Sequence, residues 1–360
     1  MNLLDDFKNP GLARKLSAAI ADRVGDRPFS LMEVCGGQTH TIYKYKLREL
    51  LPSSLRLVSG PGCPVCVTPI EYIDKAVCLG LAHGASVLTF GDLMRVPGTV
   101  LSLEKAAAEG ADIQPLYSPF QAVEFAKANP DREVVFLGIG FETTLPGIGL
   151  IIQRARAEGV DNFSVLLSAK RVPPVLEAVL SSGKATIDGF ITPGHVTAII
   201  GTRAYDELCS TYQVPMVVGG FEPLDLLGAI HLLAGELVRS GSGNLNAYTR
   251  VVSHEGNLKA QQVINEVFRQ KDDELRGLGR IANAGYGIRS EFARFDAEKR
   301  FHLRVESREP KGCICGEILC GIKEPTDCPL FGNTCTPDAP VGSCMVSTEG
   351  ACNAAFLFSD

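Results

Sequence analysis

Short apolar runs alternate with amphipathic segments between about residues 30 and 220. The runs are rich in β-branched residues, whereas the segments 70–81 and 121–128 carry apolar residues at helical spacing. Short buried strands separated by helices are typical of βαβ units with a parallel sheet. The pattern therefore predicts an α/β fold. The predicted strands are 55–59, 86–90, 134–138, 163–168, 187–191 and 216–219.

Glycine-bearing turns follow many of these strands directly. In open α/β sheets the loops beyond the carboxyl ends of the strands form the binding crevice, and glycine lets the backbone approach a ligand closely. The alternative is that glycine only makes the turns. We expect functional residues in these loops, which are 59–66, 90–98, 138–147, 192–196 and 219–223.

The remainder of the chain has a different pattern. Apolar residues recur every three or four positions in LDLLGAIHLLAGEL and LKAQQVINEVFRQKDDEL, which indicates that 224–300 is mostly helical. Residues 303–312 are polar and contain Pro310, so they are expected to connect to the tail. We expect an N-terminal helical segment (1–29), two similar α/β domains (30–118 and 119–223) and a helical, cysteine-rich region (224–360).

Charge and hydropathy exclude several classes of partner for this chain of 360 residues. Lys and Arg number 35 against 41 Asp and Glu, and no basic run of the kind that neutralises phosphates is present. The first ten residues hold two acids where a signal peptide has basic residues, and no apolar run reaches about 18 residues. We expect a cytoplasmic protein that binds neither nucleic acid nor membrane.

Twelve cysteines are the unusual feature of the composition. Because the cytosol keeps thiols reduced, this number indicates metal or redox chemistry rather than structural disulfides. The cysteines fall into two groups, which predicts two separate sulfur sites. Seven lie in the last 48 residues: Cys313, Cys315, Cys320, Cys328, Cys335, Cys344 and Cys352.

Cys63 and Cys66 form a C-x-x-C pair just before a predicted helix. Thr68 as N-cap, with Pro69 in the first turn and Glu71 three residues after Thr68, is the pattern of a capping box. A helix N-terminus lowers the pKa of nearby thiols. The pair is suited to forming and breaking a disulfide or to binding a metal, and the alternative is two structural thiols.

Cys35 lies in EVCGGQTH, where two glycines follow it directly and His40 lies five residues further on. This polar setting suits a nucleophile or one ligand of an open metal site, whereas an isolated cysteine is otherwise a small buried hydrophobe. His195 in TPGHV is a weaker candidate, because a histidine after a strand can also cap a helix. Cys78 and Cys209 lie in helix-like segments, and we expect both to pack in the core.

The tail carries the strongest signal for a metal centre. Cys315, Cys328, Cys335 and Cys352 are separated by 12, 6 and 16 residues, with turns that can fold the backbone around one centre. Four thiolates suit zinc or an iron–sulfur cluster, and the spacing does not choose between them. No histidine follows His302, which excludes histidine-containing zinc sites in the tail. A set of disulfides is the structural alternative.

Several motifs together closely resemble the HypD family of hydrogenase maturation factors. They span residues 33–352 and are EVCGGQTH, SGPGCPVCVTP, GIGFETT, TPGHV, GGFEP, FDAEKRF and the cysteine-rich tail from CGEILC to GAC.

The resemblance implies two α/β domains plus a cluster-bearing third, and a role in assembling the Fe(CN)2CO unit of nickel–iron hydrogenases. It implies a small HypC-like partner that shares the iron and a HypE-like donor that delivers cyanide as a thiocyanate. Matched by motif, Cys35 is the iron-binding thiolate, and Cys63 and Cys66 are the redox pair.

The resemblance also places a 4Fe-4S cluster in the tail. Either Cys313 or Cys315 is its first ligand, while Cys320 and Cys344 are extra thiols. Our hypothesis is that the cluster reduces the Cys63/Cys66 pair, which then reduces the thiocyanate beside iron held on Cys35. The residues proposed to surround the iron or move protons, with a structural role as the alternative, are His40, His195, Glu142 and Glu222.

Two competing functions remain open at this point. One is a thiol–disulfide oxidoreductase with a zinc-stabilised tail, and the other is a non-catalytic scaffold that only presents iron to its partners. Loss of the C-x-x-C pair separates the scaffold from the redox hypothesis, because a scaffold would still bind iron through Cys35. A brown colour with absorbance near roughly 400 nm in anaerobically purified protein would separate an iron–sulfur tail from a zinc-stabilised one.

Overall fold

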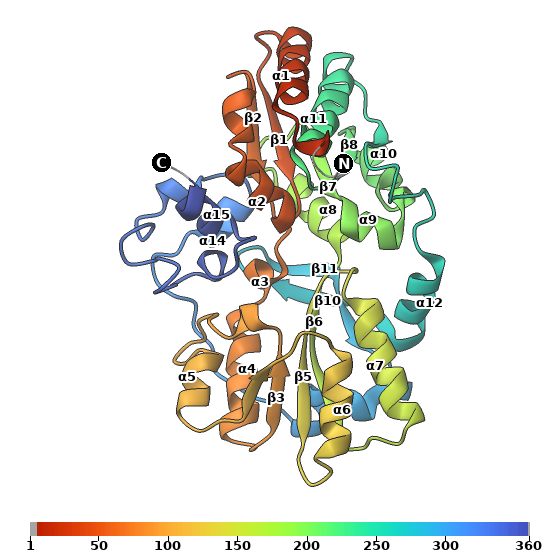
Figure 1. Ribbon diagram of the computed structural model, residues 1–360, viewed down its shortest axis with the longest axis vertical. Coiled ribbons are helices and arrows are strands. Elements are labelled where there is room, and N and C mark those ends of the chain that lie inside the picture. Colours follow the sequence, from red (N-terminus) through yellow and green to blue (C-terminus); the bar gives the residue numbers. More distant parts are fainter. Residues whose placement is uncertain (1–5, 359–360) are drawn as a thin grey trace.

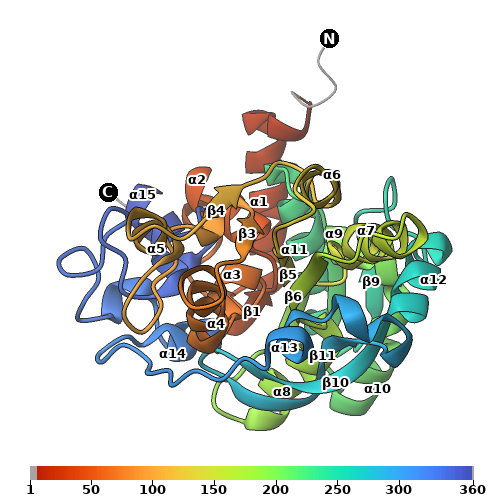
Figure 2. The same cartoon turned by 90° about the horizontal axis from the view of Figure 1, so that it is seen from below.

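Two parallel β-sheets frame the chain in the computed structural model, which describes residues 6–358. Each sheet is flanked by helices and forms one lobe, and a β-hairpin and the C-terminal tail lie beside the junction of the lobes (Figure 1). The view from below places the tail, which contains α14 (Cys315–Leu319), to one side of the two sheets, near α3 (Pro64–Val67) (Figure 2). The predicted α/β class, with two parallel sheets and a cysteine-rich C-terminal region, is confirmed.

Sheet A forms the upper lobe of Figure 1 and has the order β2-β1-β7-β8-β9, all parallel. Its side chains alternate between faces: Leu31 and Leu57 join the cluster with α1 and α11, whereas Met32 and Val58 join the cluster with α8 and α10. The strands are β1 (Phe29–Glu33), β2 (Leu55–Ser59), β7 (Gly189–Pro193), β8 (Met216–Gly219) and β9 (Asn244–Asn246). The helices of this lobe are α1 (Pro10–Val24), α2 (Gly36–Lys44), α8 (Val172–Ser182), α9 (Gly194–Ile200), α10 (Asp206–Tyr212) and α11 (Pro223–Val238).

Sheet B forms the lower lobe and has the parallel order β4-β3-β5-β6. Phe136 packs with the helices of one face, and Val135 and Leu137 pack with those of the other. Its strands are β3 (Ser86–Thr89), β4 (Ile113–Pro115), β5 (Val134–Gly140) and β6 (Phe163–Ala169). Its helices are α4 (Ile70–Leu81), α5 (Leu103–Ala108), α6 (Phe120–Ala128), α7 (Leu145–Ala157) and α12 (Leu258–Val267).

The two sheets divide the chain differently from the expected ranges 30–118 and 119–223. Strands β1 and β2 of the first range pair with β7 and β8 of the second, whereas β3 to β6 form sheet B across the expected boundary. The physical reason is that apolar runs indicate strands but not which strands pair. In the expected N-terminal segment 1–29, α1 packs on α11, and residues 1–5 lie outside the described part.

An antiparallel hairpin corrects the expectation that 224–300 is mostly helical. The segment LKAQQVINEVFRQKDDEL is helical only as α12, and it continues as β10 (Phe268–Leu275), paired with β11 (Gly279–Ile288). The hairpin is fixed to sheet B by buried Lys170, whose ammonium lies 2.7 Å from the Asp273 carboxylate, and by Arg171 N–H donating to Ala284 O. Tertiary contacts of this kind override the helical spacing.

The tail has little regular structure beyond a few short helices. Residues 303–310 are irregular and connect α13 (Ala297–Phe301) to α14 (Cys315–Leu319), and the described chain ends with α15 (Ala351–Phe358) packed on α2. Among the helices of residues 6–358, none is long and apolar enough to cross a bilayer. Short 3-10 segments occur at Asp6–Lys8, Leu47–Leu50, Gly91–Leu93, Thr202–Tyr205, Ser290–Phe295, Pro325–Asp327 and Ser343–Met345.

Candidate functional site

A cavity of about 360 Å³ lies where the carboxyl ends of the two sheets meet. Its walls come from the loops that follow β1, β2, β5, β6, β7 and β8, and from the tail. Four of the five glycine-bearing loops therefore contribute to one cavity, and 90–98 is the one that does not. The arrangement follows the rule that binding crevices form beyond the carboxyl ends of parallel strands.

Cys35 lines this cavity at the point where β1 passes into α2. Its backbone is extended (φ −154°, ψ 128°) and its N–H donates to Glu33 Oε2 at 3.1 Å, while α2 begins at Gly36. A side chain on Gly36 would overlap Glu349 of the tail, and one on Gly62 would overlap the Cys35 backbone. The glycines thus let the tail and the C-x-x-C loop approach Cys35 closely.

Electrostatics around Cys35 favour the neutral thiol. Desolvation raises the pKa of Cys35 to about 12, and the carboxylates of Glu349 and Glu33 act in the same direction. Burial raises the pKa of Glu33 to about 7, although Thr39 Oγ1 donates to its Oε1 at 2.5 Å. Since both carboxyl groups and the thiol disfavour further negative charge, a cation bound at Cys35 would be stabilised here.

Cys63 and Cys66 form a disulfide directly beside this cavity, with Cα atoms 5.2 Å apart. Cys66 lies in the short helix α3 (Pro64–Val67) and Cys63 is its N-cap, where the Cys63 Sγ accepts from the Cys66 N–H at 3.3 Å. The flanking Gly62 and Pro64 line the cavity, whereas both sulfur-bearing residues are buried.

The expected capping box at Thr68 is wrong, although a helix does begin at Ile70. Thr68 Oγ1 donates backward to Pro64 O at 2.8 Å, and no side chain caps α4. The extra short helix α3 explains the difference. Its Pro64 carbonyl accepts the hydrogen bond of the Thr68 hydroxyl, which is then not available to cap α4.

The two candidate histidines occupy different places. His195 lines the cavity and its ring stacks on Phe221, with centroids 3.8 Å apart, and partial burial lowers its pKa. His40 lies on α2 outside the cavity lining, where Nδ1 donates to Thr348 O at 3.1 Å and the ring meets Phe358 edge-on. His195 therefore faces the cavity, whereas His40 contacts the tail.

Glu142 and Glu222 lie outside the cavity lining. Glu142 is buried and accepts from the Val172 N–H at 3.1 Å, and its burial raises its pKa to about 7. Glu222 precedes α11, where its own N–H donates to Asp225 Oδ2, and its carboxylate lies 3.6 Å from Lys8 Nζ. Both carboxyl groups thus have structural contacts.

Glu349 is a cavity residue that the sequence did not reveal. It lies in STEG, between Cys344 and Cys352, and it reaches the cavity because α15 packs on α2. Burial and the nearby Asp92 carboxylate raise its pKa. Only the long-range contact of the tail identifies it, since no local spacing pattern links Glu349 to Cys35.

Six of the seven tail cysteines surround one small apolar cavity; these six are Cys313, Cys315, Cys328, Cys335, Cys344 and Cys352. Cys320 is not among them. The Sγ atoms of Cys315 and Cys344 lie 2.7 Å apart, so Cys344, expected to be an extra thiol, belongs to the group. Over residues 6–358, no three His, Cys, Asp or Glu side chains are arranged to hold a single metal ion. Converging thiols in an apolar setting nevertheless fit a multi-iron cluster.

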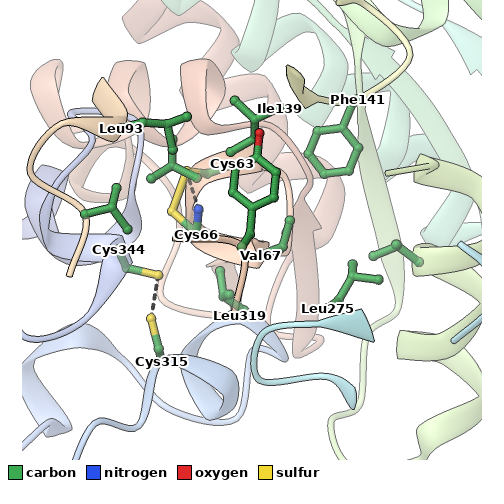
Figure 3. Close-up of a cluster of buried hydrophobic side chains, with 14 of the residues drawn as sticks. Cys63, Cys66, Val67, Leu93, Ile139, Phe141, Leu275, Cys315, Leu319 and Cys344 are labelled. Carbon is green, nitrogen blue, oxygen red and sulfur yellow. Dashed lines mark hydrogen bonds between the residues drawn. A yellow bond between two sulfur atoms is a disulfide. The ribbon is translucent and has the colours of Figure 1, made fainter. Parts of the chain in front are cut away.

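The two sulfur groups are close neighbours. Ser343 Oγ donates to Cys66 O at 3.1 Å, and Cys344 follows directly in the chain. Figure 3 shows the Cys63–Cys66 disulfide next to the Cys315–Cys344 contact, with Val67 and Leu319 nearby. Cys209 is buried in the core as expected, whereas Cys78 is half-buried on α4.

The fold and the site define an α/β protein with three neighbouring sulfur sites at the junction of its two lobes. These are a cavity thiol, a C-x-x-C disulfide beside it, and a group of tail thiols beside the disulfide. A family model described as "HypD: Hydrogenase formation hypA family" matches residues 11–359. The chain belongs to the HypD family, which confirms the resemblance found in the motifs.

Relatives named hydrogenase maturation factor HypD align over nearly the whole chain. The protein of Azotobacter vinelandii is 46% identical over 367 residues, which cover 99% of this chain and 97% of the relative. The Cupriavidus necator protein is 46% identical over 370 residues, with the same two shares. The Escherichia coli protein is 42% identical over 369 residues, covering 99% and 98%.

Proposed function

We propose that this chain assembles the Fe(CN)2CO unit of nickel–iron hydrogenases, with Cys35 holding the iron and the Cys63/Cys66 pair supplying the electrons that release cyanide. The observation that supports this most is the direct packing of Gly62 on the Cys35 backbone at one cavity. This contact supports the proposal because it holds the loop of the proposed iron-binding thiol against the loop of the proposed two-electron dithiol.

Iron is the substrate in this proposal, and Cys35 is its anchor. Low-spin Fe(II) with carbon ligands favours a soft, electron-rich ligand, which a thiolate supplies. The positive charge of the iron replaces the thiol proton, so the neighbouring Glu33 and Glu349 then stabilise the bound cation. A small HypC-like partner would complete the iron coordination from outside, and a HypE-like donor would bring the thiocyanate.

The release of cyanide balances as a thiol–disulfide exchange. A Cys63 thiolate attacks the sulfur of the carrier thiocyanate, the sulfur–carbon bond breaks, and cyanide leaves to the iron. Cys66 then displaces the carrier thiolate from the mixed disulfide, which yields the Cys63–Cys66 disulfide. The two thiols supply two electrons and two protons; one proton returns to the carrier thiol and the other must leave.

His195 is the group proposed to take that second proton. Its lowered pKa keeps the imidazole neutral near pH 7, so one ring nitrogen is free to accept a proton. Stacking on Phe221 fixes the ring plane within the cavity. His40 has only a positioning role in this proposal, because its contact with Thr348 holds in place the tail segment that carries Glu349.

In the tail, the proposed ligands of a 4Fe-4S cluster are Cys313, Cys328, Cys335 and Cys352. The alternative first ligand is Cys315, which lines the same apolar cavity and contacts Cys344. When bound, such a cluster would pass electrons from an external electron donor one at a time, so two such transfers and two protons would return the disulfide to two thiols.

Anaerobic reconstitution with a HypC partner, a HypE-type cyanide donor and iron tests the proposal. Infrared spectra should show iron-bound CN stretches in the wild-type complex, no iron-bound CN after Cys63→Ala, and no retained iron after Cys35→Ala. Cys78→Ser, which removes a half-buried thiol away from the cavity, is the matched control and should behave as wild type. Undiminished CN stretches after Cys63→Ala would refute the redox role and leave a scaffold that only presents iron.

A further inference from the structure

Arg276 lies at the tip of the β10–β11 hairpin and joins the two sulfur groups. Its backbone N–H donates to Val67 O at 2.8 Å, in the helix that carries Cys66. The next residue, Gly277, packs on Gly316 so closely that a Cβ atom on either glycine would overlap the other backbone. Gly316 directly follows Cys315 in α14, so the hairpin tip contacts both the C-x-x-C helix and the tail.

The Arg276 side chain is a buried cation with few partners. The residue is 5% exposed, and its Nε donates to Glu309 Oε2 at 2.9 Å. Nη2 lies 2.9 Å from the same oxygen, and within residues 6–358 Nη1 has no hydrogen-bond partner. Glu309 is itself 54% exposed, so solvent screens the one carboxylate that pairs with this guanidinium in the described part of the chain. A buried charge this incompletely paired is destabilising unless another negative group accompanies it.

The tail thiols lie close to this charge through the hairpin tip. Gly277, the residue after Arg276, contacts Gly316, and Gly316 directly follows Cys315, which lines the apolar tail cavity. Arg276 and Cys315 are each 5% exposed, so solvent screens little of the interaction between the guanidinium and a group bound at this thiol. The hairpin tip therefore places a buried positive charge beside the proposed cluster site.

We propose that Arg276 is a positioning residue that raises the reduction potential of the sulfur-bound group in the tail while its backbone holds the C-x-x-C helix beside it. This inference rests on the proposed function, since it assumes a 4Fe-4S cluster among the tail thiols. Reduction adds one negative charge to such a group, and a buried cation stabilises the reduced form more than the oxidised form.

Three variants of the full chain, reconstituted anaerobically, separate charge from structure. Arg276→Gln removes the charge, Arg276→Lys keeps it, and Glu309→Gln removes the partner carboxylate while leaving the arginine. The midpoint potential of the cluster is measured by redox titration, with the electron paramagnetic resonance signal of the reduced cluster as readout. All three variants keep the Arg276 backbone hydrogen bond to Val67.

Arg276→Gln should lower the potential by about 59 mV, which is a tenfold change in the one-electron reduction equilibrium. Arg276→Lys should stay near wild type, and Glu309→Gln should raise the potential. An unchanged potential in a folded Arg276→Gln protein would overturn the inference and leave the proposed function intact. If that variant does not fold, an unshifted or lowered potential in Glu309→Gln overturns it. Absence of any cluster in the wild-type protein would instead overturn the proposed cluster, and this inference with it.

Discussion

Gly62 lies directly against the backbone of Cys35, and a Cβ atom on Gly62 would overlap the Cys35 nitrogen and the Val34 carbonyl. The Gly36 N–H also points at Gly62 O, at 3.4 Å. The loop that carries Cys35 and the C-x-x-C loop are therefore held together through backbone, with no side chain between them at this contact. Their separation is set by the absence of a side chain at one position.

Gly62→Ala should separate these loops and destabilise the protein by about 1–3 kcal/mol, the usual range for overpacking a close contact. Iron retention at Cys35 should fall more than stability alone explains, because the cavity wall moves. Urea denaturation and iron content after reconstitution check both effects. The matched control is Gly228→Ala in α11, where no atom lies within 4 Å of the added Cβ and alanine should be neutral or slightly stabilising. Equal behaviour of the two variants would contradict the role given to Gly62.

Local pattern predicted most of the strands but not their pairing. The runs 55–59 and 216–219 are β2 and β8 with the same bounds, because each is apolar, β-branched and ended by a turn. Strand β1 was not predicted, because Phe29–Glu33 contains two polar residues and so forms no continuous apolar run. Glu33 is nevertheless fully buried, because Thr39 and the Cys35 N–H satisfy its carboxyl group. Such compensation depends on residues that only the folded chain brings together.

The hairpin tip yields a second matched pair of glycine variants. Gly277 and Gly279 both have positive φ, +79° and +83°, so alanine at either should cost roughly 1–2 kcal/mol in backbone strain. Only Gly277 packs on Gly316, whereas nothing lies within 4 Å of a Cβ on Gly279. Gly277→Ala should therefore be about 1–3 kcal/mol less stable than Gly279→Ala, as measured by denaturant unfolding. Similar losses in both variants would mean that the hairpin does not hold α14.

The candidate site was predictable where chemistry follows local spacing. Cys35, the C-x-x-C pair and His195 each follow a strand, and the topology brings all of them to one junction. Glu349 and Arg276 could not be predicted, since one depends on α15 packing on α2 and the other on the hairpin reaching α3. Both contacts join segments more than 200 residues apart in the chain.

Buried Glu142 should make stability fall as the pH rises from about 4.5 to 7. Its pKa is 4.5 when exposed and about 7 in the folded chain, so the folded state binds more protons in this window. The contribution of Glu142 to the free energy of unfolding is fully present below pH 4.5, and about 3 kcal/mol of it is lost above pH 7. The charged groups near Glu142 do not reverse this, since Arg171 lowers the pKa only partly against burial.

Glu142→Gln removes this loss, because glutamine does not ionise and its Oε1 still accepts from the Val172 N–H. Relative to wild type, the variant should gain about 3 kcal/mol between pH 4.5 and 8 in urea unfolding. The contribution of Glu33 to the pH dependence cancels in the difference between variant and wild type. The pKa of Glu33 is also raised to about 7, so its ionisation lowers stability in the same pH range. A difference that stays constant with pH would show that Glu142 is already ionised in the folded chain.

Single serine substitutions in the tail should divide its cysteines by whether they line the apolar cavity. Cys328→Ser and Cys313→Ser each remove a thiol from the proposed ligand set, so iron and acid-labile sulfide should fall well below wild type after anaerobic reconstitution. Cys320→Ser is the control, because this buried thiol lies outside the cavity lining and burial raises its pKa. It should keep the wild-type iron content at a modest loss of stability. Cys315→Ser separates the two possible first ligands: retained iron supports Cys313, and loss of iron in Cys315→Ser with retention in Cys313→Ser would reverse the assignment.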